Sequence, residues 1–178
     1  ATAAAAEAIR AAVDLPIVAL EPGVKPAVAL TKSGVIGVLA TTRTLESERF
    51  QRLVGNHANG YRVLAQACPG LAEAIEAQGP ESAEVSALLD TFVAPLAAAA
   101  ADVVVLGCTH YPWVAEAIAR RMPAGTVLLD TGEPVARQLE RLLAAGNILG
   151  GGQGRLTVAT SGAPASVAAT VNRLFGQK

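Results

Sequence analysis

The feature that most constrains the fold is a regular alternation of short β-branched runs with longer Ala- and Leu-rich segments. Runs of Val, Ile and Thr favour strands, whereas long segments rich in Ala, Leu and Glu favour helices. Strands that alternate with helices predict βα units and a mostly parallel sheet covered by helices. The pattern predicts strands at residues 16–20, 35–40, 61–67, 102–107, 126–130 and 155–160. It predicts helices at residues 2–12, 45–54, 71–77, 82–100, 113–121, 134–145 and 164–175.

The composition narrows the class of protein. The chain has 178 residues, of which 52% are apolar, and this suits one well-packed core or two small lobes. Its 14 basic and 15 acidic residues do not form the basic cluster that nucleic-acid binding requires. The longest charge-free apolar run, residues 92–101, is interrupted by Pro95 and is too short to span a bilayer, and no basic and apolar leader opens the chain. With only two cysteines, the sequence predicts a soluble cytoplasmic protein that binds neither nucleic acid nor a membrane.

Two composition breaks indicate the domain organisation. Residues 21–26 (EPGVKP) are interpreted as a crossover between lobes. Residues 147–154 (NILGGGQG) are interpreted as a flexible connector, because they follow a predicted helix and no Gly-Lys-Ser/Thr of a phosphate-binding loop follows. We expect an α/β protein with two-lobed, doubly wound, mostly parallel sheets. A complete central lobe would cover residues 21–134, and an incomplete lobe would be formed by residues 1–20 and 135–178.

The strongest candidate for a reactive site is the segment DVVVLGCTHYP at residues 102–112. A predicted strand ends just before Cys108, and Pro112 is suited to the first turn of the helix that follows. Ligands of parallel α/β sheets bind beyond the carboxyl ends of the strands, where Cys108, Thr109 and His110 would lie. A helix N-terminus and an imidazole both stabilise a thiolate, the reactive form of cysteine. Cys108 is therefore a candidate base or nucleophile; the alternative is a buried cysteine beside a capping threonine and a structural histidine.

A second strand end carries three hydroxyls, on Thr41, Thr42 and Thr44. Hydroxyls and N–H groups at the start of a helix can cap that helix, and they can also hold a carboxylate. The sequence leaves both functions open for this segment.

Three further polar residues carry weaker signals. Glu76, at the end of a short predicted helix, has by itself the pattern of a solvated surface residue. His57 has no obvious partner and is also interpreted as a surface residue. Cys68 follows a strand as Cys108 does, so spacing alone would allow the two thiols to act as opposed acid and base. The tight Pro-Gly turn after Cys68 and the lack of a neighbouring imidazole argue against that pairing.

Three sequence blocks give the chain a family resemblance. They are GVLAT at residues 37–41 with Ser47 and Phe50 behind it, ACPGL at 67–71 and LGCTHYP at 106–112. In identity, order and spacing they resemble the glutamate racemases of the aspartate/glutamate racemase superfamily. The segments at residues 21–27 and 130–136 also look like that family, and the similarity runs from Ala1 to at least Leu149.

The resemblance implies a cofactor-independent interconversion of L- and D-glutamate that supplies D-glutamate for peptidoglycan. Two thiols on opposite faces of the substrate would alternate as base and acid. The resemblance implies that neither a metal nor an organic cofactor is needed. It also implies glutamate as the small-molecule substrate and a homodimer for the full-length family. Carried over by motif, Cys108 would be the thiol on the L-glutamate side. His110 would assist Cys108 and contact the substrate, and Glu76 would orient His110. Thr109 would bind the substrate, and Thr41 and Thr44 would help to hold a carboxylate.

One part of the family pattern is absent from the sequence. Ala1-Thr2-Ala3 looks like the tail of the family's Cys-Asn-Thr-Ala-Thr-Ala motif, so the first catalytic cysteine would precede Ala1. We therefore expect a fragment or truncated form of a racemase that is inactive by the two-thiol route as given. Two alternatives are a superfamily decarboxylase that uses a single cysteine and a non-catalytic remnant that binds glutamate or another carboxylate.

Overall fold

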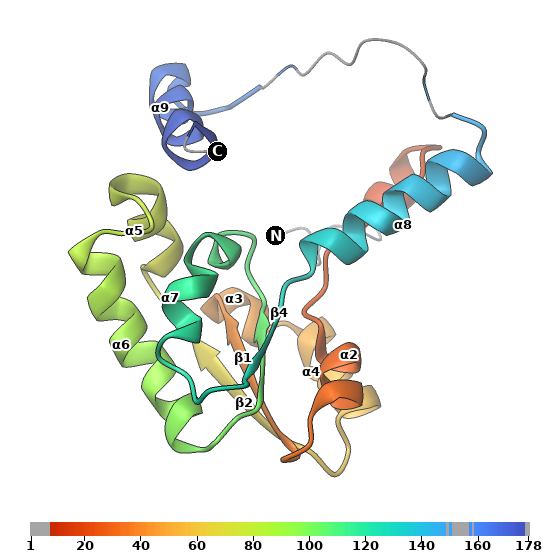
Figure 1. Cartoon of the computed structure of the whole chain (residues 1–178). Helices are drawn as coiled ribbons and strands as arrows, with labels where there is room; N and C mark the ends of the chain where they lie inside the picture. The colour runs from red at the N-terminus through yellow and green to blue at the C-terminus, as the bar shows by residue number, and fades with distance from the viewer. Residues whose placement is uncertain (1–7, 149, 151–156, 158, 177–178) are drawn as a thin grey trace.

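A four-stranded parallel sheet forms the centre of the chain, as the computed structural model shows for residues 8–148, 150, 157 and 159–176 (Figure 1). Its strand order is β2-β1-β3-β4. The strands are β1 (Val35–Ala40), β2 (Arg62–Ala67), β3 (Val103–Leu106) and β4 (Val127–Leu129). The register places Leu39 of β1 beside both Gln66 of β2 and Leu106 of β3. The carboxyl ends of these three strands therefore lie at one edge of the sheet.

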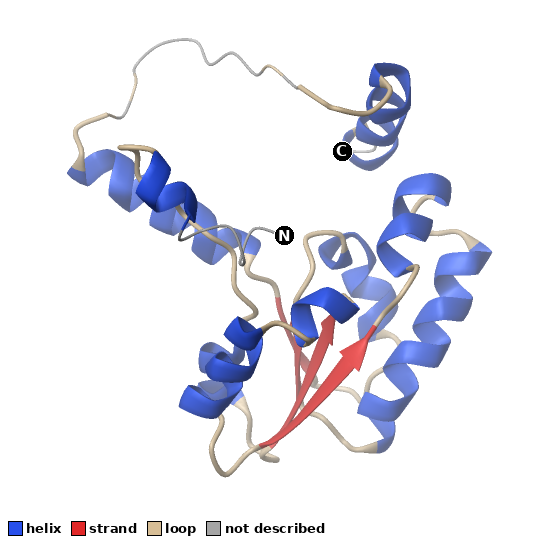
Figure 2. Cartoon of the chain, turned by 180° about the vertical axis from the view of Figure 1, so that it is seen from behind, coloured by secondary structure: helices blue, strands red, loops and turns tan. Residues whose placement is uncertain are grey.

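Helices cover both faces of this sheet (Figures 1 and 2). The helices are α2 (Val24–Leu30), α3 (Thr42–Leu45), α4 (Glu48–His57), α5 (Leu71–Gln78), α6 (Ala83–Ala98), the 3₁₀ turn η1 (Tyr111–Val114), α7 (Ala115–Ala119), α8 (Gly132–Ala145) and α9 (Pro164–Phe175). Residues 8–12 are also helical. Within this described part of the chain, no helix is long and apolar enough to cross a membrane.

The side chains of β1 divide between two cores, because successive residues of a strand point to opposite faces. Ile36 and Val38 pack with α2 and α4, whereas Leu39 packs with α5 and α6. At Gly37 a Cβ atom would lie 2.4 Å from Cδ2 of Leu96, so the missing side chain allows α6 to approach the sheet. Burial on both faces confirms the prediction of a doubly wound α/β fold with a parallel sheet.

The four strands of the sheet agree with the prediction to within one residue at each end. The predicted strand at residues 16–20 is wrong: this segment has no strand structure. Pro16 has no N–H for a ladder, and no described strand lies beside the segment to pair with it. Half of the predicted strand at 155–160 lies outside the described residues, and residues 157, 159 and 160 have no strand structure. The first part of the helix predicted at 2–12 also lies outside the described residues.

One predicted loop is helical in the structure, and one predicted helix is divided in two. Residues 21–26, interpreted as a crossover, contain the start of α2, which accommodates Pro26 in its first turn, where a backbone N–H has no intrahelical partner. The single helix predicted at 45–54 is two helices, α3 and α4. The second starts afresh because the side chain of Ser47 accepts a hydrogen bond from the N–H of Phe50.

The terminal helices occupy different places. In both views α8 lies beside the helical residues 8–12, away from the sheet, and none of its residues is buried (Figures 1 and 2). By contrast, α9 packs against α5, and its Leu174 is only 7% exposed in the core shared with α5 and α6. The division into lobes at residues 21–134 and at 1–20 with 135–178 stays a prediction.

Candidate functional site

The candidate site lies where three neighbouring strands end. The N–H of Gly107 donates to the carbonyl of Leu39 at 2.8 Å, and the N–H of Cys68 donates to the carbonyl of Ala40 at 2.9 Å. The first bond extends the pairing of β1 with β3 to Gly107, just before Cys108, and the second extends the pairing of β1 with β2 to Cys68. A Cβ atom at Gly107 would lie 2.9 Å from the Leu39 oxygen, so a glycine is needed for this close approach.

A thiol, an imidazole and a carboxylate lie in contact at this edge. The Sγ atom of Cys108 is 3.6 Å from Nδ1 of His110, and Nε2 of His110 is 2.5 Å from Oε1 of Glu76. Cys108 and His110 belong to the loop after β3, whereas Glu76 comes from the last turns of α5. The side chains of His110 and Glu76 are 27% and 50% exposed. The structure thus brings together the three residues that the resemblance names as catalytic.

The charge of His110 is set by its two neighbours. The hydrogen bond to Cys108 raises the pKa of His110, partial burial opposes that effect, and Glu76 raises the pKa further, to about 9. At neutral pH the ring is therefore an imidazolium, in which both nitrogens are donors. Nδ1–H then faces the sulfur of Cys108, and Nε2–H donates to the carboxylate of Glu76.

Cys68 occupies a different environment from Cys108. It is 2% exposed, and its Sγ donates to the carbonyl of Gln66 at 3.5 Å. Burial raises the pKa of Cys68 to about 11, against the smaller opposing effects of the Tyr111 hydroxyl and the Ala40 backbone. A buried, protonated thiol is a poor base, in agreement with the interpretation that Cys68 is not a proton-transfer partner.

Tyr111 is a residue near both cysteines whose place the sequence did not reveal. Its ring is fully buried in the core, and its hydroxyl has no hydrogen-bond partner of ordinary geometry within the described part of the chain. Burial raises the pKa of Tyr111, and the nearby Cys68 and Cys108 raise it further. A tyrosine in the sequence signals neither its burial nor its partners, so only the structure could place this hydroxyl beside the Cys68 thiol.

Thr41 caps the N-terminus of α3 in the structure, and Thr44 lies within that helix. Oγ1 of Thr41 accepts from the N–H of Thr44 at 3.3 Å and lies 2.9 Å from Oγ1 of Thr44. This is the capping function that the sequence allowed. Thr41 directly follows β1, next to the strand that leads to Cys108. His57, the last residue of α4, is exposed, as predicted.

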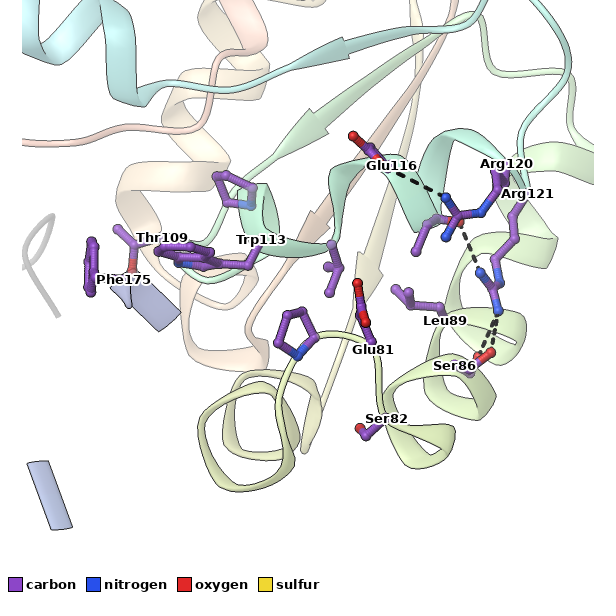
Figure 3. Close-up of a pocket in the computed structure, with 14 residues that line it drawn as sticks. Glu81, Ser82, Ser86, Leu89, Thr109, Trp113, Glu116, Arg120, Arg121 and Phe175 are labelled. Atoms are coloured by element: carbon purple, nitrogen blue, oxygen red, sulfur yellow. Dashed lines mark hydrogen bonds and ion pairs between the residues drawn. The ribbon is translucent and has the colours of Figure 1, made fainter. Parts of the chain in front are cut away.

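Thr109 faces a cavity of about 740 Å³ next to this site (Figure 3). The cavity is lined by residues of α6, η1 and α7 and by Phe175 of α9. Figure 3 shows Thr109, Trp113 and Phe175 close together at one end of it. Cys108, His110 and Glu76 are not among the residues that line it. The cavity therefore adjoins the contact chain of thiol, imidazole and carboxylate without containing it.

The side chains of the described residues offer no metal site, since no group of three or more His, Cys, Asp or Glu among them is close enough to hold an ion. A parallel sheet with helices on both faces and a cysteine at a strand end, backed by an imidazolium and a carboxylate, defines a doubly wound α/β protein with a thiol-based site.

Comparison with known proteins gives the family. Residues 1–139 match the Asp/Glu/Hydantoin racemase family. The glutamate racemase of Pseudomonas putida (strain W619) is 51% identical over 142 residues, which are 80% of this chain and 54% of that protein. The glutamate racemase of Herpetosiphon aurantiacus is 47% identical over 170 residues, which are 94% of this chain and 67% of that protein. The chain belongs to the Asp/Glu/Hydantoin racemase family, and it spans about half the length of several of the curated relatives it matches.

Solved structures agree with this assignment. Glutamate racemase isoform RacE1 from Bacillus anthracis superposes with a TM-score of 0.80 at 27% identity, over 98% of this chain and 66% of that one. The Escherichia coli glutamate racemase, solved in complex with L-glutamate and the activator UDP-MurNAc-Ala, gives a TM-score of 0.71 at 32% identity, over 78% of this chain and 53% of that one.

Proposed function

We propose that this chain forms one half of a glutamate racemase site, in which Cys108 transfers the α-proton of glutamate. The observation that carries the proposal is the contact chain from Cys108 through His110 to Glu76 at the carboxyl edge of the sheet. The names of the relatives support glutamate as the substrate.

The proposed step is a proton transfer without a cofactor. The thiolate of Cys108 takes the α-proton and becomes a thiol, and the electron pair of the broken C–H bond stays on the substrate as a carbanion. Because the α-carbon is a weak acid, the site must supply fixed charges and donors that stabilise the transition state. His110, held by Glu76, presents its Nδ1–H to the sulfur, and Thr41, Thr44, Thr109 and His110 are the proposed contacts of the substrate.

Inversion needs a second acid on the opposite face of the carbanion. The chain has two cysteines, and Cys68 is buried with a raised pKa. We therefore propose that the second thiol is not supplied by these 178 residues, and that this chain alone does not racemise glutamate by the two-thiol route. When Cys108 itself returns a solvent-derived proton to the same face, the result is exchange without inversion.

The biological setting is proposed from the same family. A glutamate racemase supplies D-glutamate for peptidoglycan, acts in the cytoplasm and forms a homodimer. These three features are expected of the complete enzyme to which such a chain would contribute.

The test is α-hydrogen exchange in D2O. L-Glutamate and D-glutamate are incubated separately with the chain, loss of the α-hydrogen is followed by NMR, and the enantiomers are separated by chiral chromatography. We expect exchange of one enantiomer without its inversion, loss of that exchange in Cys108→Ser, and retention of it in the matched control Cys68→Ser. Undiminished exchange by Cys108→Ser would refute the proposed base, and enzymatic inversion by the unmodified chain would refute the one-thiol site.

Two further outcomes identify the alternative functions. Calorimetric binding of glutamate without any exchange would replace the proposal with a non-catalytic binding module. Release of CO2 from an arylmalonate, with no exchange on glutamate, would replace it with a decarboxylase.

A further inference from the structure

The last helix, α9, lies against both elements that carry the candidate site. Its Leu174 is buried in the core shared with α5. Its Phe175 meets the ring of Trp113 edge to face, with ring centroids 5.0 Å apart and an interplanar angle of 86°. Figure 3 shows this aromatic pair, and Trp113 lies in η1, directly after the loop that holds His110. The helix thus contacts the segment of His110 on one side and the helix of Glu76 on the other.

Arg173 makes the polar part of this contact. Its Nη1 donates to the backbone carbonyl of Glu76 and, at 2.5 Å, to that of Ala77. Both carbonyls belong to the last turn of α5, where helical carbonyls have no N–H partner within the helix. A guanidinium at this end also interacts favourably with the helix dipole.

The end of α5 lies directly beside this side chain. Gly79, at a φ of 92°, ends the helix, and its N–H donates to the carbonyl of Ile75 at 3.0 Å. A Cβ atom at Gly79 would lie in ordinary van der Waals contact with Arg173, 3.5 Å from its Cδ, so the arginine stem runs beside this residue. The arginine stem therefore packs over the glycine, and its head binds the carbonyls that the Gly79 N–H leaves unpaired.

We propose that Arg173 is a positioning residue, which fixes the last turn of α5 so that the Glu76 carboxylate stays against His110. The inference rests on the proposed function for the meaning of the site. The positioning itself is measurable without any activity, because His110 reports on its contact with Glu76.

The sign of the effect separates positioning from simple electrostatics. The ionisable groups that act on the His110 ring are Cys108 in its own loop and Glu76 on α5. Removal of the Arg173 charge would by itself raise the pKa of His110, because a like charge nearby disfavours the protonated ring. A loss of alignment at Glu76 would lower that pKa. The two explanations therefore predict opposite shifts.

The test uses the whole chain with isotope-labelled histidine. The imidazole of His110 is titrated by NMR, and alkylation of Cys108 by iodoacetamide at pH 7 is followed by mass spectrometry of its peptide. In Arg173→Met we expect the pKa of His110 to fall by about one unit and the alkylation of Cys108 to slow by roughly three- to tenfold. Arg173→Lys keeps the charge but lacks the planar fork, so we expect a smaller fall.

The matched control is Arg121→Met. Arg121 also joins two elements, because its Nε donates to Asp90 at 2.7 Å and its Nη2 to Ser86 Oγ at 2.7 Å, but none of its hydrogen bonds reaches α5 or His110. We expect this variant to lower stability and to leave the pKa of His110 unchanged. An unchanged or raised pKa in Arg173→Met, or an equal fall in Arg121→Met, overturns the proposal. If Arg173→Met does not fold, the absence of any shift in Arg173→Lys overturns it in the same way.

This outcome is independent of the exchange assay. If glutamate exchange fails but the pKa of His110 falls in Arg173→Met, the positioning holds and the proposed function does not.

Discussion

Asp102 is the residue whose substitution tests the packing of the sheet most directly. Its Oδ1 accepts from the hydroxyl of Thr31 at 2.5 Å, and its Oδ2 accepts from the N–H groups of Lys32 at 2.7 Å and Ser33 at 2.8 Å. The carboxylate therefore ties the loop between α2 and β1 to the start of β3. Burial opposes the charged form, but the bonds from Thr31, Ser33 and Lys32 outweigh it and hold the pKa of Asp102 well below its usual range.

The expected cost of Asp102→Asn follows from these bonds. The asparagine oxygen can keep the two backbone N–H donors, and its amide can donate to Thr31, so the main loss is the charge. A hydrogen bond to a charged group contributes about 1.5–3 kcal/mol and a neutral one about 0.5–1.5 kcal/mol. Two bonds that each lose about 1 kcal/mol reduce the free energy of unfolding by about 2 kcal/mol.

The pH dependence gives a second magnitude with a defined sign. Because the folded pKa of Asp102 is lowered, its contribution is fully present above the unfolded pKa of about 3.9 and is lost as pH falls below that value. The wild-type chain is expected to lose this contribution on acidification, and the asparagine variant is not.

The assay is urea unfolding followed by the fluorescence of Trp113, the single tryptophan of the chain. The control is Asp90→Asn, which removes an exposed ion pair to Arg121 and should cost at most about 1 kcal/mol. If Asp102→Asn unfolds within about 0.5 kcal/mol of the wild type, or no differently from the control, the tie between the two segments does not contribute as argued.

Three further predictions concern the site. Glu76→Gln should lower the pKa of His110 from about 9 by about one unit in an NMR titration. The control Glu73→Gln, one turn earlier on α5, should leave this pKa unchanged, and an equal shift in both variants would contradict the contact between Glu76 and His110. Because the folded pKa of His110 exceeds its unfolded value of about 6.5, its stabilisation is present below pH 6.5 and lost as pH rises to about 9. The free energy of unfolding, measured by urea titration, should fall over this range by less than roughly 3 kcal/mol, since Glu76 is half exposed, and His110→Asn should lack this fall. Tyr111→Phe removes a buried hydroxyl that interacts with the Cys68 thiol but makes no hydrogen bond of ordinary geometry among the described residues, so thermal unfolding should show an unchanged or higher Tm. A loss of stability above about 1 kcal/mol would mean that the hydroxyl is well bonded.

The four strands of the sheet could be predicted because their signal is local. The run of valines in β3 is apolar at every position, which is typical of a strand buried on both faces, and all four of its residues are buried. The same reasoning failed at residues 16–20, because an apolar run becomes a strand only where a neighbouring strand pairs with it. It also missed α2, in which Val24 and Ala27 are fully buried against the sheet, because packing there overrides a local pattern rich in proline and glycine.

The sequence by itself placed Cys108 and His110 side by side in one loop after a strand, since a spacing of two residues needs no tertiary contact. Only the tertiary structure decided which cysteine is accessible. Cys68 and Cys108 follow the strands on either side of β1, but Cys68 is buried in the core with Tyr111 and α5 side chains, whereas Cys108 is half-buried beside an imidazolium. The tertiary structure also brought Glu76 to 2.5 Å from His110, although the two are 34 residues apart in sequence. In the same way it brought Arg173 into contact with Glu76, which lies 97 residues before it. Such contacts depend on how helices pack across a sheet, and no local pattern along the chain records them.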